Sequence, residues 1–179
     1  MNKKLEPLMS SEKQDWGTPP QFIEWIEKEL IKGPIDLDVC AHEDNNKCDR
    51  YFTIEDDALS QTWYCENAWM NPPFGRDLPK FIDKAIEEIE EGNARNVWIL
   101  VPARTDTKWA HRLFNTLWTH QVWLIKGRFN FQFSRNVKGA NAPFPSMLIR
   151  LSCDDCLKPR HGLRNYIKPL DVPKEARGF

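Results

Sequence analysis

Segments with the pattern of buried strands alternate with segments of helical periodicity, and this alternation limits the fold more than any other feature of the chain. The strand-type runs are 35–39, 68–70, 97–101, 122–125 and 147–149, and the helix-type runs are 19–30, 78–89 and 109–117. Strands separated by helices usually form a parallel sheet, whereas strands without a helix between them pair in opposite directions. The order therefore predicts an α/β fold with a mostly parallel sheet and an antiparallel edge strand.

The two ends of the chain are expected to lie outside this sheet. The first helix should begin at Thr18, which would cap it, with Pro19 as its first helical residue. The proline-containing stretch after Ser152 shows no comparable periodicity. We therefore expect an N-terminal arm at residues 1–13, one domain at 14–151 and a peripheral tail at 152–179.

Composition places the chain among ordinary globular proteins. Its 179 residues are 41% hydrophobic and 12% aromatic, which is enough for one domain with a real core. No apolar run approaches the roughly 20 residues of a membrane span, and the first residues lack the apolar region of a signal peptide. Five cysteines, an odd number, favour reduced thiols. A cytoplasmic protein without a membrane partner is the expectation.

A long acid-free stretch gives the chain a strongly uneven charge distribution. No Asp or Glu occurs from Thr107 to Cys153, where about seven would be expected by chance. The bases in this stretch are Lys108, Arg112, Lys126, Arg128, Arg135, Lys138 and Arg150. Such a surface suits a polyanion, because neutralising phosphates releases counterions. An ordinary solvated face beside uncharged buried strands is the alternative interpretation.

The tetrapeptide Asn71-Pro72-Pro73-Phe74 follows an apolar strand-type run and carries the most specific chemistry in the sequence. The side-chain oxygen of Asn71 and the carbonyl of Pro72 can accept both protons of a planar NH₂ group, while neither proline offers a competing N–H. Phe74 can stack on the ring that carries this amine. The alternative is a turn stiffened by proline, with Phe74 in the core.

Several further motifs occur in a characteristic order around this tetrapeptide. They are Trp16-Gly17-Thr18-Pro19, Leu37-Asp38-Val39-Cys40-Ala41, Asp57-Ala58-Leu59, the segment 102–109 and Gly127-Arg128-Phe129. Together, over residues 14–151, they resemble the phage-type DNA adenine-N6 methyltransferases. The resemblance implies a Rossmann-like methyltransferase fold, S-adenosyl-L-methionine as methyl donor, no metal, and double-stranded DNA from which an adenine is flipped.

The resemblance also assigns roles to individual residues. The catalytic residues would be Asn71, Pro72, Pro73 and Phe74. The cofactor would contact Trp16, Thr18, Pro19, Asp38, Cys40 and Asp57. With the acid-free stretch, it suggests DNA contacts by Arg104, Lys126, Arg128, Arg135, Lys138 and Phe144. Phe144 would form the wall of the base pocket opposite Phe74.

Two departures from the family pattern affect the cofactor loop. No glycine follows Asp38, although glycines at this place usually let the backbone approach the ligand. Only 32 residues separate Asp38 from Asn71, and three acids there, Glu43, Asp44 and Asp49, are candidates for binding the ribose.

Simpler and competing interpretations exist for these residues. Asp38 and Asp57 also suit surface turns, Arg104 a surface ion pair, and Phe144 a core position. A protein glutamine or an RNA amine would present a similar NH₂ group to the tetrapeptide. A non-catalytic nucleic-acid-binding module held by zinc is a third hypothesis, based on Cys40, His42 and Cys48 and on Cys153, Cys156 and His161.

Overall fold

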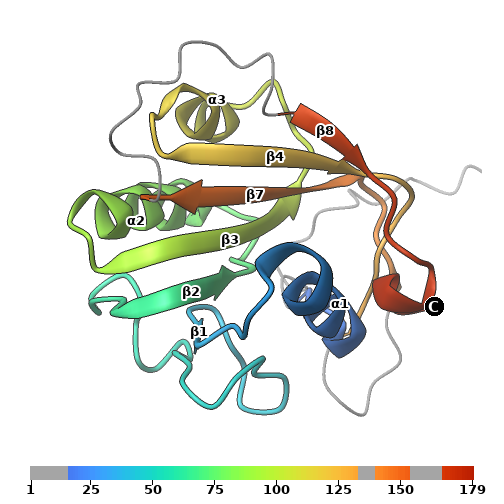
Figure 1. Cartoon of the computed structure of the whole chain (residues 1–179), viewed down its shortest axis with the longest axis horizontal. Helices are drawn as coiled ribbons and strands as arrows, with labels where there is room; N and C mark the ends of the chain where they lie inside the picture. The colour runs from blue at the N-terminus through green and yellow to red at the C-terminus, as the bar shows by residue number, and fades with distance from the viewer. Residues whose placement is uncertain (1–15, 133–139, 154–166) are drawn as a thin grey trace, which may run out of the picture.

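The computed structural model describes residues 16–132, 140–153 and 167–179, and these residues form an α/β structure (Figure 1). Its main sheet, within the described residues, has the strand order β1-β2-β3-β7-β4-β8. The strands are β1 (Leu37–Asp38), β2 (Cys65–Met70), β3 (Ala94–Pro102), β7 (Ser146–Ser152), β4 (Thr119–Ile125) and β8 (Ile167–Leu170). A separate ribbon pairs β5 (Asn130–Phe131) with β6 (Ala140–Asn141). The α/β class and the mostly parallel sheet are confirmed.

The antiparallel strand lies inside the sheet, so the expectation of an antiparallel edge was wrong. β7 pairs antiparallel with both β3 and β4, whereas the other neighbouring strands are parallel. Met147, Leu148 and Ile149 are completely buried, because this strand has partners on both sides and layers on both faces. The edge beside β4 is occupied by β8, which the sequence pattern does not reveal.

Alternate residues of the strands supply two cores, one on each face of the sheet. Val97, Ile99 and Val101 of β3 pack on the side of α2 (Leu78–Glu90) and α3 (Lys108–Asn115). Trp98 and Leu100 pack on the side of α1 (Pro20–Ile26). Because successive side chains of a strand point to opposite faces, one apolar run serves both layers. The helices on the two faces are visible in Figure 1.

The first helix begins later than the sequence suggests. Pro19, not Thr18, is the N-cap, and Pro20 is the first helical residue. A proline disfavours helical geometry in the residue before it, and Pro19 accordingly has an extended ψ of 134°. The hydroxyl of Thr18 is therefore available for another role. The helix continues as a π-helical segment, η1 (Glu27–Ile31), and stops at Lys32, whose φ is 60°.

Local sequence features explain the buried face and the end of α2 and the start of α3. Leu78, Ile82, Ala85 and Ile89 bury one face of α2, and the chain leaves the helix through Gly92, whose φ is 73°. The N-cap of α3 is Thr107, whose hydroxyl accepts a hydrogen bond from the amide of Ala110.

Residues 167–179 are part of the fold, contrary to the expected peripheral tail. Beyond β8, Val172 and Ala176 are buried in the core on the α1 side. A short 3₁₀ helix, η3 (Glu175–Arg177), packs against α1. The arm at 1–13 lies outside the described residues. In the part of the chain that is described, no helix is long and apolar enough to cross a membrane.

Candidate active site

The carboxyl ends of the parallel strands bring several candidate residues to one edge of the sheet. Asp38 ends β1, Asn71 follows β2, Arg104 follows β3 and Lys126 follows β4. Phe144 reaches the same edge because it precedes the antiparallel strand β7. Open α/β sheets usually bind their ligands at this edge. The topology therefore unites residues that are distant in the sequence.

Asn71 is held in one orientation by the N-terminal segment. Its Nδ2 donates a hydrogen bond to the carbonyl of Trp16, which can only accept. The amide is thereby oriented with Oδ1 on its other side, and this oxygen is buried without a hydrogen-bond partner among the described residues. An unpaired buried acceptor costs roughly 1–3 kcal/mol. Such a group calls for a functional explanation, and a ligand amine would satisfy it.

Thr18 carries a second buried polar atom without a partner. Its side chain is 1% exposed, and Oγ1 makes no hydrogen bond within the described structure. The neighbouring Gly17 accepts a hydrogen bond from the amide of Gln132 at 2.9 Å. A Cβ at Gly17 would collide with the carbonyl of Gln132 and the side chain of Asn45. The segment 16–18 is thus tightly enclosed, and its free hydroxyl is fixed in place.

Asp38 is a buried carboxyl group and not a surface turn residue. It is 2% exposed, and its oxygens accept hydrogen bonds from the amides of Cys40 at 3.3 Å and Lys47 at 3.1 Å. Burial raises the pKa of Asp38 to about 6, although the Lys47 charge and these hydrogen bonds oppose the change. Burial, assisted by the Asp38 charge, also raises the pKa of the Cys40 thiol well above its ordinary value. The Cys40 thiol is therefore neutral at physiological pH.

The loop after Asp38 contains two site residues that the sequence analysis missed. Lys47 donates from Nζ to the carbonyl of Asn45 at 2.6 Å and to its side-chain oxygen. Asn45 is buried, and its side chain packs directly over Gly17. This loop thus connects Asp38 with the segment that orients Asn71. A polar loop without periodicity gives no signal for such contacts, and Glu43, Asp44 and Asp49 are exposed.

Phe74 of the tetrapeptide forms an aromatic cluster with three other rings, those of Trp16, Phe131 and Phe144. Phe74 meets Phe144 at a centroid distance of 5.6 Å and Phe131 at 6.3 Å, and Trp16 meets Phe131 and Phe144 at 5.6 Å each. Phe74 and Phe144 are perpendicular, with an angle of 88° between the rings. A base that stacks on both of two rings needs those rings to be roughly parallel. The two rings are therefore neighbours, but they are not arranged as opposite walls.

The two prolines of the tetrapeptide differ in their surroundings. Pro72 is buried, and no hydrogen bond to its carbonyl is found within the described residues. The carbonyl of Pro73 accepts from the amide of Gly75 at 2.9 Å, which closes a turn. Of the two carbonyls, that of Pro72 is available to a ligand.

The remaining cofactor candidates are less closely connected with Asn71. Pro19 is buried and accepts from the amide of Phe22 at 3.0 Å. Asp57 lies in an exposed turn with a φ of 50°, and its carbonyl accepts from the amide of Ser60. No polar contact between Asp57 and Asp38 or Asn71 occurs in the described part of the chain.

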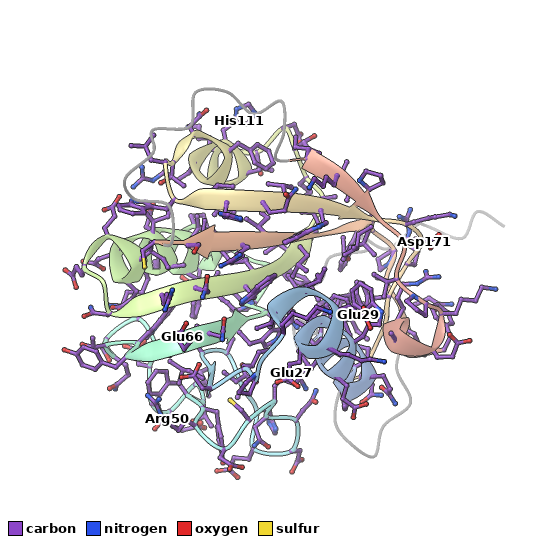
Figure 2. The ribbon with its side chains drawn as sticks, viewed as in Figure 1. Glu27, Glu29, Arg50, Glu66, His111 and Asp171 are labelled. Carbon is purple, nitrogen blue, oxygen red and sulfur yellow. The ribbon has the colours of Figure 1, made fainter. Side chains whose placement is uncertain are left out.

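The bases of the acid-free stretch do not form one uniform surface. Lys126 lies 3.3 Å from Asp171, an acid of the later segment that is labelled in Figure 2. Arg112 pairs with Asp83 at 3.2 Å. Arg128 and Arg104 are exposed, and the carbonyl of Arg128 accepts from Arg177 at 3.0 Å. The predicted DNA contacts Arg135 and Lys138 lie outside the described residues.

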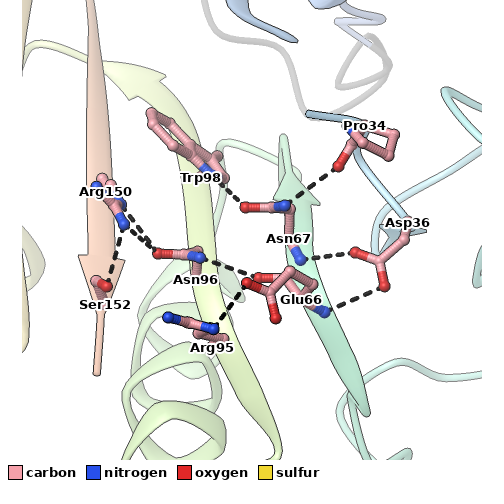
Figure 3. Close-up of polar contacts among 9 residues, drawn as sticks. All are labelled: Pro34, Asp36, Glu66, Asn67, Arg95, Asn96, Trp98, Arg150 and Ser152. Carbon is pink, nitrogen blue, oxygen red and sulfur yellow. Dashed lines mark hydrogen bonds and ion pairs between the residues drawn. The ribbon is translucent and has the colours of Figure 1, made fainter. Parts of the chain in front are cut away.

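Arg150 belongs to a polar network within the sheet. Its guanidinium donates to Oδ1 of Asn96 at 2.7 and 2.9 Å and lies 5.4 Å from the centroid of the Trp98 ring. Asn96 and Trp98 connect this group to Glu66 and Asn67 on β2 (Figure 3). These contacts give Arg150 a structural role within the sheet.

The zinc hypothesis finds no arrangement to support it. Within residues 16–132, 140–153 and 167–179, no three His, Cys, Asp or Glu side chains are placed to hold a metal. Cys40, His42 and Cys48 therefore do not form a ligand set. Cys156 and His161 lie outside the described residues.

Comparison with known proteins agrees with the order of the motifs. The family model described as DNA N-6-adenine-methyltransferase (Dam) matches residues 7–159, a match that ends before β8. A DNA N-6-adenine-methyltransferase of Escherichia phage T1 is 35% identical over 96 residues, which are 52% of this chain and 38% of the relative. A protein of the same name from Haemophilus phage HP1 (strain HP1c1) is 34% identical over 99 residues, which are 55% and 56% of the two chains. The match therefore covers 38% of the length of the first relative and 56% of the length of the second, less than two thirds of either. Because the family model covers most of the described fold and every motif of the site, the chain belongs to the DNA N-6-adenine-methyltransferase (Dam) family.

Proposed function

We propose that this protein transfers a methyl group from S-adenosyl-L-methionine to the N6 amine of an adenine flipped out of double-stranded DNA. The observation that carries the proposal is the orientation of Asn71. The Trp16 carbonyl occupies its NH₂ group, so that the buried Oδ1 remains as an acceptor. An exocyclic amine has the two protons that Asn71 and the Pro72 carbonyl require.

The two acceptors address the chemical difficulty of this reaction. The lone pair of an adenine amine is delocalised into the ring, which makes the planar amine a weak nucleophile. Hydrogen bonds from both N6 protons to Asn71 Oδ1 and the Pro72 carbonyl favour the pyramidal form, in which the lone pair is localised. Asn71 is held from behind by Trp16, so little reorientation is needed when the amine arrives.

The residues around Thr18 and Asp38 fit a small polar cofactor. The buried, unpaired hydroxyl of Thr18 and the buried carboxyl of Asp38 could bind the amino and hydroxyl groups that S-adenosyl-L-methionine carries. Trp16, Pro19 and Cys40 would supply apolar contacts, and Asp57 would reach the cofactor from the exposed turn. When bound, the cofactor supplies an activated methyl group, so that the proposal needs no metal.

The aromatic and basic residues fit a nucleic-acid substrate. An adenine N6 inside a duplex is reached only after base flipping, and Phe74 would offset part of the unpairing cost by stacking. Phe144 would complete the pocket after one of the two perpendicular rings turns. Arg104 and Arg128 would contact the DNA backbone. Both curated relatives are phage proteins, so we expect the enzyme to act on DNA in a bacterial cytoplasm.

A methyl-transfer assay with labelled S-adenosyl-L-methionine and separate DNA, RNA and protein acceptors tests this proposal. We expect label in double-stranded DNA, and loss of that label in Asn71→Ala. Label in protein or RNA alone would instead support an enzyme that acts on a glutamine side chain or an RNA amine.

A further inference from the structure

The segment 171–178 folds back onto α1 and the turn 126–130, although it lies far from both in the sequence. Val172 is 1% exposed and Ala176 is 6% exposed, and both belong to the core beneath α1. In Figure 1 this segment lies beside α1, near the mark for the chain end. Its burial shows that it is packed on the α1 side of the sheet.

Arg177 holds the backbone of the turn 126–130. Its Nε donates to the carbonyl of Val172 at 3.1 Å, and its Nη1 donates to the carbonyl of Arg128 at 3.0 Å. The guanidinium also occupies the space above Gly127, whose φ is 87° and where a Cβ would collide with it. One planar, forked group thus joins two carbonyls, which the single ammonium of lysine cannot reproduce.

Gly178 connects the same turn to the beginning of the first helix. Its carbonyl accepts a hydrogen bond from Nδ2 of Asn130 at 2.7 Å. A Cβ at Gly178 would lie 2.6 Å from the carbonyl oxygen of Asn130 and 2.9 Å from Cγ of Pro19. The segment therefore contacts the turn that carries Arg128 and the residue next to Thr18.

This segment also places an acidic side chain opposite one of the two basic side chains of the turn. Asp171 lies 3.3 Å from the ammonium of Lys126, and both side chains are 77% exposed. The backbone amide of Lys126 donates to the carbonyl of Leu170 at 3.0 Å. Lys126 thus faces an acid on this segment, while the side chain of Arg128 is exposed on a backbone that Arg177 holds.

We propose that the segment 171–178 is a clasp that fixes the turn 126–130 against the start of α1, with Arg177 as a positioning residue for the DNA contact of Arg128. This inference rests on the proposed DNA methylation and extends it. Without the clasp, Arg128 would keep its charge but lose the fixed backbone position that Arg177 gives it. Its contribution to DNA binding would then fall although the residue itself is unchanged.

Amide hydrogen exchange tests the clasp without any substrate. In Arg177→Ala, we expect the amides of Lys126 and Ala142, which bond to Leu170 and Phe129, to exchange about tenfold faster or more. Lys174→Ala is the matched control, because it removes one exposed positive charge from the same segment. Its exchange should stay within about twofold of the wild type. Unchanged exchange in Arg177→Ala would overturn the proposal.

A double-mutant cycle on duplex DNA binding tests the consequence of the clasp. Arg128→Ala should weaken binding about tenfold in the wild type but about twofold or less in Arg177→Ala. A merely structural role for Arg177 would leave the Arg128→Ala factor equal in both backgrounds, and that result would overturn the proposal. Arg177→Lys should resemble Arg177→Ala.

Methylation of DNA by the wild type, measured in the same series, separates the two claims. If the wild type methylates DNA but the effects of Arg128→Ala and Arg177→Ala on DNA binding are additive, the clasp proposal is refuted and the proposed function stands. A wild type that methylates no DNA would refute the proposed function, and the exchange measurement would still decide whether segment 171–178 fixes the turn.

Discussion

Replacing Asp38 with asparagine should stabilise the ligand-free protein at neutral pH and weaken its binding of S-adenosyl-L-methionine. Burial raises the pKa of this carboxyl from 3.8 to about 6. Between these values the folded protein binds a proton that the unfolded chain has lost, so stability falls as the pH rises from about 4 to 6. Above pH 6 the ionised carboxylate costs about 3 kcal/mol, since each unit of pKa corresponds to about 1.4 kcal/mol.

Asparagine removes this charge at the cost of one hydrogen bond. Asp38 accepts from the amides of Cys40 and Lys47, and asparagine has only one oxygen with which to accept. The lost bond costs about 1–1.5 kcal/mol, which leaves a net gain of about 1.5–2 kcal/mol at pH 7.5. At pH 4 the wild-type carboxyl is already protonated in the folded state, and the gain should disappear.

Denaturant unfolding at pH 4 and pH 7.5, with calorimetry of cofactor binding, measures both effects. Asp36→Asn is the matched control, because Asp36 also accepts two backbone hydrogen bonds but is partly exposed. It should be destabilised at pH 7.5 by about 1 kcal/mol. The reasoning would be refuted if Asp38→Asn were also destabilised at pH 7.5, or if its stability difference from the wild type were the same at both pH values.

Substitutions at four further positions probe the cofactor, base and DNA contacts. Thr18→Val removes a buried hydroxyl without a partner, so the ligand-free variant should be at least as stable as the wild type in thermal unfolding. Its affinity for the cofactor, measured by calorimetry, should fall about tenfold. Phe74→Ala should impair methylation of paired adenines more than of mismatched ones, because stacking offsets an unpairing cost of a few kcal/mol, and equal losses would count against stacking. Phe74→Trp should be tolerated better than Phe74→Ala. Arg128→Ala should reduce the slope of log affinity against log salt by about one unit, and Lys126→Ala by less, because Lys126 faces Asp171. Identical slopes in both variants would contradict this distinction.

The sheet and its strand ends were predictable because they depend on local patterns. The apolar run at 97–101 alternates between two cores, and the strand 65–70 delivers Asn71 to the carboxyl edge. The start of α1 was misjudged because Pro19 and Pro20 both suit a first helical turn. Only the restriction that Pro20 places on Pro19 decides between them.

The strand order was not predictable, because it depends on tertiary pairing. β7 enters between β3 and β4, and β8 is a four-residue strand that contains Pro169. A short proline-containing stretch reads as a loop in sequence. Leu124, the residue that pairs with Pro169, lies more than 40 residues earlier, so no local pattern predicts this contact.

In the candidate site, too, the sequence motif was predictable but the tertiary contacts of its residues were not. The motif identified Asn71, but the bond from its amide to the Trp16 carbonyl is a contact between distant segments. Burial decided between the two interpretations of Asp38, and it left Asp57 in an exposed turn. Asn45 was missed because its importance comes from its contact with Gly17, and Lys47 because its importance comes from its bonds to Asn45 and Asp38.

Nucleoside analysis of DNA from matched reactions tests the central claim most directly. Double-stranded DNA is incubated with S-adenosyl-L-methionine and either the wild type or Asn71→Ala, digested, and analysed by mass spectrometry. The account predicts N6-methyldeoxyadenosine with the wild type and none with Asn71→Ala, whose cofactor affinity should stay within about threefold of the wild type. Equal methylation by both proteins, or a methylated base other than adenine, would contradict the role assigned to the Asn71 amide.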